Sequence, residues 1–429
     1  MKLGSLTPLL IGVLLLFGCG GSSSTPASTP TSFSKQTYPV VGTYATGGNV
    51  VPVTVNGNLC GSAASQYPNE ICTSVTICSP SNSAQCQTIS NVLVDTGSIG
   101  LRLFSSVISV SLSPVTNGSM SLAECVQYGD GSSQWGPVEY AYVKLGSEPA
   151  VAMPIMVINQ SYGTPPAACT AAQSTPDTSP ADAGFNGIIG VGLFAQDCGA
   201  ECVSDFGNQQ YYTCSGSDCS SGAKVDLDTQ VQHPVSLVPT DNNGVILKLP
   251  AVSNVNGVAS LSGSLVLGIG TQTNNTPSGV TTYPTDSNGN FSTTFAAYRA
   301  SAMTDSFIDS GSSALFFPSP TNGSLPDCGT TEADEKGLYC PTSVQSFSAT
   351  AAGASGSPSG NVSFQVANAN QLLASSNSAN QVFSDFASSL AGGSTPYFDW
   401  GLPFFYGRNV YVGIDGTTSS LGTGPYWSY

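Results

Sequence analysis

The sequence is short of charge, and above all of positive charge. Only 8% of its residues are charged, nine are Lys or Arg, and the formal net charge is −16. So few basic side chains cannot form a surface that meets many phosphates, which excludes a nucleic-acid partner. Long helices with ion-paired faces are disfavoured for the same reason. The many Gly, Ser, Thr and Val residues favour a mainly β protein.

Histidine is nearly absent, since His233 is the single one. A Ser-His-Asp or Cys-His site needs an imidazole base, and nothing around HPVSL resembles the surroundings of a nucleophile. We therefore expect His233 to be a surface or loop residue. TDNNG and TDSNGN lack the Glu of a calcium loop and are read as turns. No cofactor and no metal site is expected.

The N-terminal segment has the pattern of an export signal. An early lysine and an apolar stretch predict a signal peptide over residues 1–18. The tetrapeptide LFGC resembles the lipobox of bacterial lipoproteins, which implies a lipid on Cys19. Gly20 implies, by the same likeness, transport to the outer membrane. Residues 19–36 then form the lipidated Cys and a flexible tether, and the protein is held at the membrane with its folded part facing the periplasm or cell surface.

Cysteine usage agrees with export. Setting Cys19 aside, twelve of the thirteen cysteines remain, an even number that predicts disulfides in an oxidising compartment. The pairing stays open, although some cysteines form local groups: Cys198/Cys202 with Cys214/Cys219, and Cys328 with Cys340. Zinc held by the four thiolates at 198–219 is an alternative, disfavoured because exported thiols oxidise and the spacing is not CxxC.

One motif occurs twice, about half the chain apart. VLVDTGSIG and FIDSGSSAL each place an Asp, Asp95 and Asp309, between an apolar strand and a hydroxyl-Gly-Ser turn. Two such copies suggest an internal duplication in which the two turns meet. Carboxylates about 3 Å apart cannot both ionise, so they share one proton. The charged acid can then activate a water while the protonated acid binds a carbonyl.

At these residues the chain resembles the pepsin-like aspartic peptidases, whose signature is Asp-Thr/Ser-Gly-Ser/Thr. The likeness implies that Asp95 and Asp309 are the catalytic pair. It implies supporting roles for the six residues that follow the two acids: Thr96, Gly97, Ser98, Ser310, Gly311 and Ser312. Thr96 and Ser310 would brace the two lobes, and Ser98 and Ser312 would bind the acids.

Other landmarks follow in the order of that family. The segment Tyr128-Gly129-Asp130-Gly131 resembles the tip of its β-hairpin flap. Segments 185–192 and 398–415 resemble the strands that run beside the two acids. Arg102 stands where the family usually has a Trp that supports the flap tyrosine, and an ordinary surface charge is the simplest reading of it.

The resemblance implies a bilobal, pepsin-like double β-barrel with an internal pseudo-twofold duplication. The expected lobes are residues 37–240 and 241–429. Segment 370–393 is the best helix candidate, and 349–361 is expected to be a loop. The three tryptophans are expected in the core or packed on strands: Trp135, Trp400 and Trp427.

These features lead to two hypotheses of function. The first is an aspartic endopeptidase acting on a peptide or protein substrate. The second is a non-catalytic cell-envelope lipoprotein that binds peptide, glycan or an envelope partner, in which Asp95 and Asp309 only cap the backbone of structural turns. The whole sequence also resembles a family of exported bacterial lipoproteins of unknown function.

Overall fold

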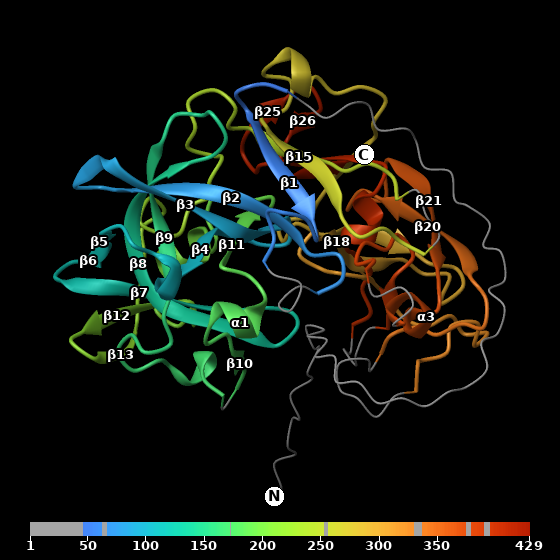
Figure 1. Cartoon of the computed structure of the whole chain (residues 1–429), viewed down its shortest axis with the longest axis horizontal. Helices are drawn as coiled ribbons and strands as arrows, with labels where there is room; N and C mark the ends of the chain where they lie inside the picture. Colours follow the sequence, from blue (N-terminus) through green and yellow to red (C-terminus); the bar gives the residue numbers. More distant parts are fainter. Residues whose placement is uncertain are drawn as a thin grey trace, which may run out of the picture.

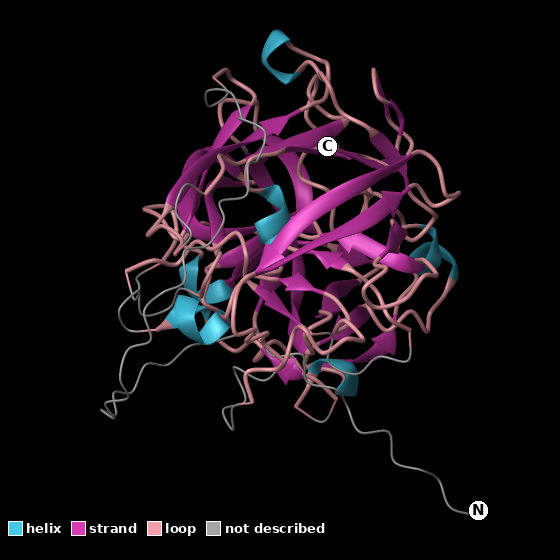
Figure 2. Cartoon of the chain, turned by 90° about the vertical axis from the view of Figure 1, so that its right-hand side faces the viewer, coloured by secondary structure: helices cyan, strands magenta, loops and turns pink. Residues whose placement is uncertain are grey.

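A computed structural model describes residues 46–61, 67–171, 173–252, 256–329, 337–374, 379–389 and 395–429. The expected signal peptide, Cys19 and the tether lie outside the described residues. The prediction of a mainly β protein is confirmed, since strands and loops make up nearly all of the described chain and its helices are short (Figure 2). No helix within the described ranges is long and apolar enough to span a membrane.

An antiparallel sheet built from both ends of the chain lies between the two halves of the molecule (Figure 1). In the order of pairing it contains β1 (Val50–Val55), β15 (Leu261–Leu267), β14 (Gly244–Lys248), β24 (Asn409–Gly413), β27 (Tyr426–Ser428) and β16 (Thr282–Pro284). β1 comes from the first expected lobe and pairs with β15 of the second. The two expected lobes are therefore joined by a common sheet.

The N-terminal half contains six strands whose pairings close into a ring. In ring order they are β3 (Asn82–Asp95), β2 (Ile71–Ser79), β8 (Ser132–Lys144), β9 (Val151–Ile158), β4 (Ile99–Phe104) and β11 (Gly187–Val191). Strand β11 closes the ring by pairing with β4 on one side and with β3 on the other. A closed ring leaves no exposed sheet edge at the strand that carries Asp95.

Shorter strands extend this half beyond the ring. They are β5 (Ser113–Pro114), β6 (Thr116–Asn117), β7 (Met120–Gln127), β10 (Thr175–Pro176), β12 (Tyr211–Ser215) and β13 (Asp218–Gly222). The long hairpin of β7 and β8 is the most important of these for the site, because its turn is the expected flap.

The C-terminal half is built on a seven-stranded sheet. Its order is β21 (Ser359–Val366), β20 (Gln345–Ala352), β17 (Phe291–Thr294), β18 (Met303–Ile308), β23 (Asp399–Trp400), β19 (Leu315–Phe316) and β22 (Ala387–Ser388). A small hairpin of β25 (Thr418–Ser419) and β26 (Gly422–Thr423) lies outside it.

The helices are short. The structure differs in part from two local predictions, the helix at 370–393 and the loop at 349–361. The described α-helices are α1 (Pro180–Ala183), α2 (Ala200–Ser204) and α3 (Ala369–Leu373). Among the described residues of the predicted helix 370–393, only residues 370–373 are helical, and Ala387–Ser388 are in β22. The middle of the predicted loop 349–361 is the turn of the β20–β21 hairpin, but its two ends are in the strands, because alternate small residues such as Ala349 and Ala351 pack into the core.

All three tryptophans are buried, as expected. The cores of the two halves differ in composition. Around β3 and β11 the core is aliphatic, whereas the core beneath β18 and β23 contains a stack of aromatic rings. Phe398 stacks on Phe317 with ring centroids 4.9 Å apart and on Trp400 with centroids 4.0 Å apart. These rings lie directly under the strand that precedes Asp309.

The prediction of disulfides is confirmed, and the twelve described cysteines form six of them. The pairs are Cys60–Cys72, Cys78–Cys86, Cys125–Cys169, Cys198–Cys202, Cys214–Cys219 and Cys328–Cys340. The zinc alternative at 198–219 is wrong, because its four sulfurs are used in two disulfides. Cys60, Cys72 and Glu70 also approach one another, but two of these three groups are disulfide sulfurs.

Candidate active site

The two repeated motifs meet in the folded protein. Asp95 is the last residue of β3, and Asp309 directly follows β18. Residues Val92–Val94 are buried on both faces of β3, which explains why the motif begins with an unbroken apolar run. Asp95 is 7% exposed, and Asp309 is partly buried. The strand ends thus bring two carboxyl groups to one place below the surface.

Thr96 and Ser310 join the two loops by reciprocal hydrogen bonds. The Thr96 hydroxyl donates to the carbonyl of Ile308 over 3.0 Å, and the Ser310 hydroxyl donates to the carbonyl of Val94 over 2.7 Å. Each hydroxyl also accepts from the backbone N–H of the other, over 2.9 Å and 3.1 Å. Both side chains are buried, so these four bonds replace water and fix the distance between the loops.

Each carboxyl group is held by its own loop in the same way. The N–H of Gly97 donates to Asp95 Oδ1, and the N–H of Gly311 donates to Asp309 Oδ1, both over 2.7 Å. The Ser98 hydroxyl donates to Asp95 Oδ2. Ser312 Oγ lies 2.9 Å from Asp309 Oδ2. The acids are therefore oriented by short, local contacts within each motif.

The glycines are required because each loop passes against the acid of the other. A Cβ atom on Gly97 would lie 2.7 Å from Cγ of Asp309, and one on Gly311 would lie 2.8 Å from Oδ1 of Asp95. Carbon atoms in ordinary contact are about 3.5–4.0 Å apart. Any larger residue at either position would push the two carboxyl groups apart.

The electrostatics of the pair favour one shared proton. Burial, followed by the charge of Asp95, raises the pKa of Asp309 well above its usual range. A hydrogen bond between the side chains of Asp95 and Asp309 acts in the same direction. The raised pKa favours the protonated form of Asp309, and Asp95 beside it accepts two hydrogen bonds from its own loop.

The apolar segments expected beside the acids do lie there. β11 runs parallel to β3 and places Gly190 opposite Asp95. β23 runs parallel to β18, and the N–H of Asp309 donates to the carbonyl of Trp400 over 3.1 Å. In both halves the parallel neighbour also pairs with an antiparallel strand, β4 in the first half and β19 in the second.

The expected flap residues form the tip of the β7–β8 hairpin. The N–H of Tyr128 donates to the carbonyl of Ser132, and that of Gly131 donates to the carbonyl of Tyr128, both over 3.0 Å. Asp130 Oδ1 accepts from the N–H of Ser132, and Gly129 is exposed at the turn. Burial raises the pKa of both Tyr128 and Asp130, and the charge of Asp95 adds to each shift.

The tyrosine of this hairpin is held by a residue that sequence reasoning missed. The Tyr128 hydroxyl donates to Gln134 Oε1 over 3.0 Å, and Gln134 Nε2 donates to Asp177 Oδ2 over 2.9 Å. Gln134 is fully buried on β8. It is six residues after Tyr128, on the returning strand, so hairpin geometry and not a sequence motif brings the two together.

The reading of Arg102 as a surface charge is wrong. Its side chain is buried and donates over 2.8 Å to each of two carboxyl groups, Glu124 and Asp197, and over 2.6 Å to the carbonyl of Ile99. Glu124 lies on β7, so this cluster connects the strand after Asp95 to the hairpin. A buried cation is tolerated here because two acids and a carbonyl replace its water.

His233 lies in a loop, as expected, but it is not at the surface. It is fully buried, and its Nδ1 accepts from the N–H of Val235 over 3.0 Å. Burial lowers the pKa of His233 to about 4, so its imidazole is neutral at physiological pH. A polar residue followed by Pro gave no hint of burial, because the surrounding loops and not the local sequence cover it.

A second missed residue lies beside Asp309. Asp399, the first residue of β23, is 5% exposed, and its Oδ2 lies 2.6 Å from Ser312 Oγ. Burial raises the pKa of Asp399 well above its usual range. In sequence, FDWG shows only one more Asp among many, and pairing of β23 with β18 is what places it at the site.

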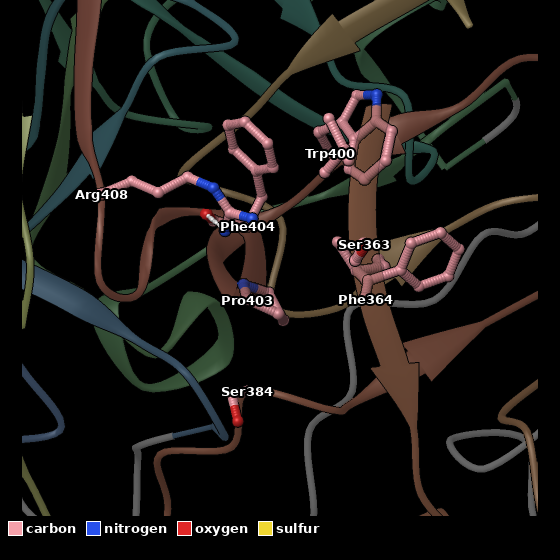
Figure 3. Close-up of a pocket in the computed structure, with 9 residues that line it drawn as sticks. Ser363, Phe364, Ser384, Trp400, Pro403, Phe404 and Arg408 are labelled. Carbon is pink, nitrogen blue, oxygen red and sulfur yellow. Dashed lines mark hydrogen bonds between the residues drawn. The ribbon is translucent and has the colours of Figure 1, made fainter. Parts of the chain in front are cut away.

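A separate cavity occurs in the C-terminal half (Figure 3). Trp400, Phe404 and Arg408 line it together with Ser363 and Phe364 of β21 (Figure 3). Its volume is about 10 Å³, which is room for no more than one water molecule. It cannot hold a substrate, so the chemistry of this protein is better sought at the two acids.

The fold and site thus describe a mainly β protein, rich in disulfides, in which two motifs from opposite halves pair around two aspartates. A family model described as "Protein of unknown function (DUF3443)" matches residues 45–429. The chain belongs to this family. No curated protein matches the sequence.

Proposed function

We propose that this protein is an aspartic endopeptidase with a pepsin-like fold. The observation that carries the proposal is the reciprocal bonding of the two acid loops, which brings Asp95 and Asp309 together from opposite halves of the chain. A structural turn needs no second, matching carboxyl group. Two acids that share a proton between a charged and a neutral member are suited to acid–base hydrolysis.

The proposed duplication is supported by matching strand arrangements. In each half, the strand before the acid has a parallel neighbour, and that neighbour has an antiparallel partner that follows the acid in sequence. Two such units related by an approximate twofold axis would account for the symmetric hydrogen bonds of Thr96 and Ser310. On this view the sheet of β1, β15 and β14 joins the two lobes.

The proposed reaction uses water as the nucleophile. Ionised Asp95 takes a proton from a water molecule, whose oxygen attacks the peptide carbonyl carbon, while protonated Asp309 donates to the carbonyl oxygen. The tetrahedral intermediate then collapses: Asp95 gives its new proton to the nitrogen, the C–N bond breaks, and one hydroxyl of the intermediate returns a proton to Asp309 as the carboxylic acid product forms. Both products are released without a covalent intermediate, and the proton count of the pair is restored.

The hairpin tip supports a peptide as substrate. An extended peptide lying under Tyr128–Gly131 could pair with the backbone of the hairpin as an added strand. Tyr128 and Asp130 lie within electrostatic reach of Asp95, so such a peptide would pass close to the acids. The hydrogen bond from Tyr128 to Gln134 would keep the tyrosine in place.

We further propose that the protein acts outside the cytoplasm, anchored by a lipid on Cys19 at the outer membrane. Six disulfides support an oxidising compartment. Mass spectrometry of the protein from membranes tests the anchor, because a lipidated Cys19 adds the mass of its acyl chains. A soluble mature chain that begins elsewhere would contradict it.

Cleavage of an unfolded protein between pH 3 and 6, followed by mass spectrometry of the fragments, tests the enzymatic proposal. We expect Asp95→Asn and Asp309→Asn each to lose at least about 10³-fold in kcat/KM, because each removes one of the two proton carriers. Asp228→Asn, which alters an exposed carboxylate, is the matched control. Wild-type cleavage by either active-site variant contradicts the proposal. Peptide binding without cleavage would favour the binding lipoprotein instead.

A further inference from the structure

A third carboxyl group distinguishes the second acid loop from the first. On β11, Ile188 lies opposite Leu93, two residues before Asp95. At the matching place on β23, Asp399 lies opposite Phe307, two residues before Asp309. Burying a carboxyl group costs more free energy than burying an apolar side chain, so the presence of an acid at this position requires an explanation.

The contacts of Ser312 indicate what Asp399 does. Its Oγ is 2.9 Å from Asp309 Oδ2 and 2.6 Å from Asp399 Oδ2. A hydroxyl has one hydrogen, so it can donate to one of these carboxyl groups and must accept from the other. A carboxyl group that donates carries a proton. One of the two acids is therefore protonated whenever both contacts are hydrogen bonds.

The proton of Asp309 is shared with Asp95, so Asp399 is the better candidate for the donor to Ser312. Its Oδ1 has no hydrogen-bond partner among the described residues, and no ion pair of the described chain reaches it. Asp309 Oδ1, by contrast, accepts from the N–H of Gly311. An ionised Asp399 would leave a buried negative charge with a single donor. Burial raises the pKa of Asp399, in agreement with a neutral side chain.

We propose that Asp399 is a positioning residue that carries a proton, donates it to Ser312, and so keeps the hydrogen of Ser312 directed at Asp309. The bonds then run in one direction, from Asp399 through Ser312 and Asp309 to ionised Asp95, and each bond polarises the next. This inference rests on the proposed function for its effect on catalysis. Its structural part stands on the hydrogen-bond geometry alone.

The arrangement makes the site sensitive to pH. The titratable groups within reach of Asp399 are Asp309, Asp95 and Tyr397, and none of them carries a positive charge. When Asp399 ionises, the hydrogen of Ser312 turns towards it, Asp309 loses its outer donor, and a second negative charge appears near the pair. Ionisation of Asp399 therefore ends activity at the high-pH side of the profile.

Two variants at this position separate positioning from packing. In Asp399→Asn the amide donates to Ser312 at every pH, whereas Asp399→Ile copies the first half of the molecule and cannot donate. We expect the Asn variant to keep the wild-type maximum and to move the high-pH limb of the kcat/KM profile up by about one pH unit or more. The Ile variant should also move the high-pH limb of the profile up. It should lower kcat as well, because isoleucine cannot donate a hydrogen bond to Ser312. If the high-pH limb stays in place in both variants, the proposed effect of Asp399 on catalysis is wrong.

Urea unfolding between pH 4 and 8 tests the proton without any assay of activity. A raised folded-state pKa means that the folded protein holds a proton which the unfolded chain has lost, so wild-type stability falls as pH rises from about 4, the ordinary pKa of Asp, towards the folded-state pKa. The Asn variant should lack part of this fall, and its curve should diverge from that of wild type. If the stability of wild type and of the Asn variant changes with pH in parallel, Asp399 does not carry the proposed proton. If the two curves diverge but the wild-type protein cleaves no substrate, the proton on Asp399 is supported and the proposed peptidase function is rejected.

Discussion

The two halves of the molecule hold their acids with the same backbone contacts but in different surroundings. Around Asp95 the neighbouring strand is apolar, and the hydroxyl of Ser98 donates to that acid alone among the described residues. Around Asp309 the neighbouring strand brings a third acid, and Ser312 lies between two carboxyl groups. The difference teaches that a repeated motif determines where two acids meet, while the strands beside them determine which acid holds the proton.

The packing beneath the acids offers the largest effect with which to test this comparison. Trp400 and Ile189 lie at matching places, opposite Ile308 and Val94. We expect Trp400→Ala to lower the free energy of unfolding by about 3–5 kcal/mol and Ile189→Ala by less, because the former leaves a larger cavity and loses the indole bond to Thr293. Urea unfolding measures both. A smaller loss for Trp400→Ala would show that the aromatic core collapses around the gap.

The glycines test whether the two loops constrain each other equally. Gly97→Ala and Gly311→Ala each place a methyl group against the acid of the opposite loop. We expect each to lower kcat/KM by about 100-fold, because an acid displaced by about 1 Å loses its alignment. Gly48→Ala, which meets only Ser147 at 3.7 Å, is the control. Near-wild-type activity of either loop variant would contradict the proposed geometry.

The bracing hydroxyls should have a smaller and shared effect on stability. Thr96→Val or Ser310→Ala leaves a buried carbonyl and a buried N–H without partners, at a cost of about 1–3 kcal/mol. The double variant should cost less than the sum of the two, since both belong to one network. Thr88→Val removes one hydroxyl of an exposed pair and should cost little. Strict additivity would show that the two loops do not depend on each other.

Buried acids outside the site should make each half sensitive to pH over a different range. Burial raises the pKa of Glu70 to about 8 and that of Asp385 to about 7. Raised values mean that the folded state holds these protons, so stability falls as pH rises from about 4 to 7 for Asp385 and to 8 for Glu70.

The smallest expected effect is therefore a change in how steeply the free energy of unfolding falls with pH. In unfolding curves taken at several pH values, Glu70→Gln should flatten the fall up to pH 8, and Asp385→Asn only up to pH 7. Asp228→Asn, at an exposed position, should leave the slope unchanged. If both buried variants follow the wild-type curve, these carboxyl groups are ionised in the folded protein.

Residues that depend on local sequence were predicted well. The turns at 95–98 and 309–312 and the hairpin turn at Tyr128 all depend on neighbours within a few residues. Residues defined by distant strands were not. The burial of Arg102 and of His233 is not predictable in this way, because a sequence does not reveal which loops cover a position.

What the sequence by itself determined is a mainly β chain with little charge, an even set of oxidised cysteines, and two copies of an acid turn. These follow from composition and from spacing within single strands and turns, where the covalent chain already limits the geometry. Only the tertiary structure decided that the two turns bond to each other and that Asp399 stands beside one of them. Such contacts join residues far apart in the chain, and they exist only after the strands have paired.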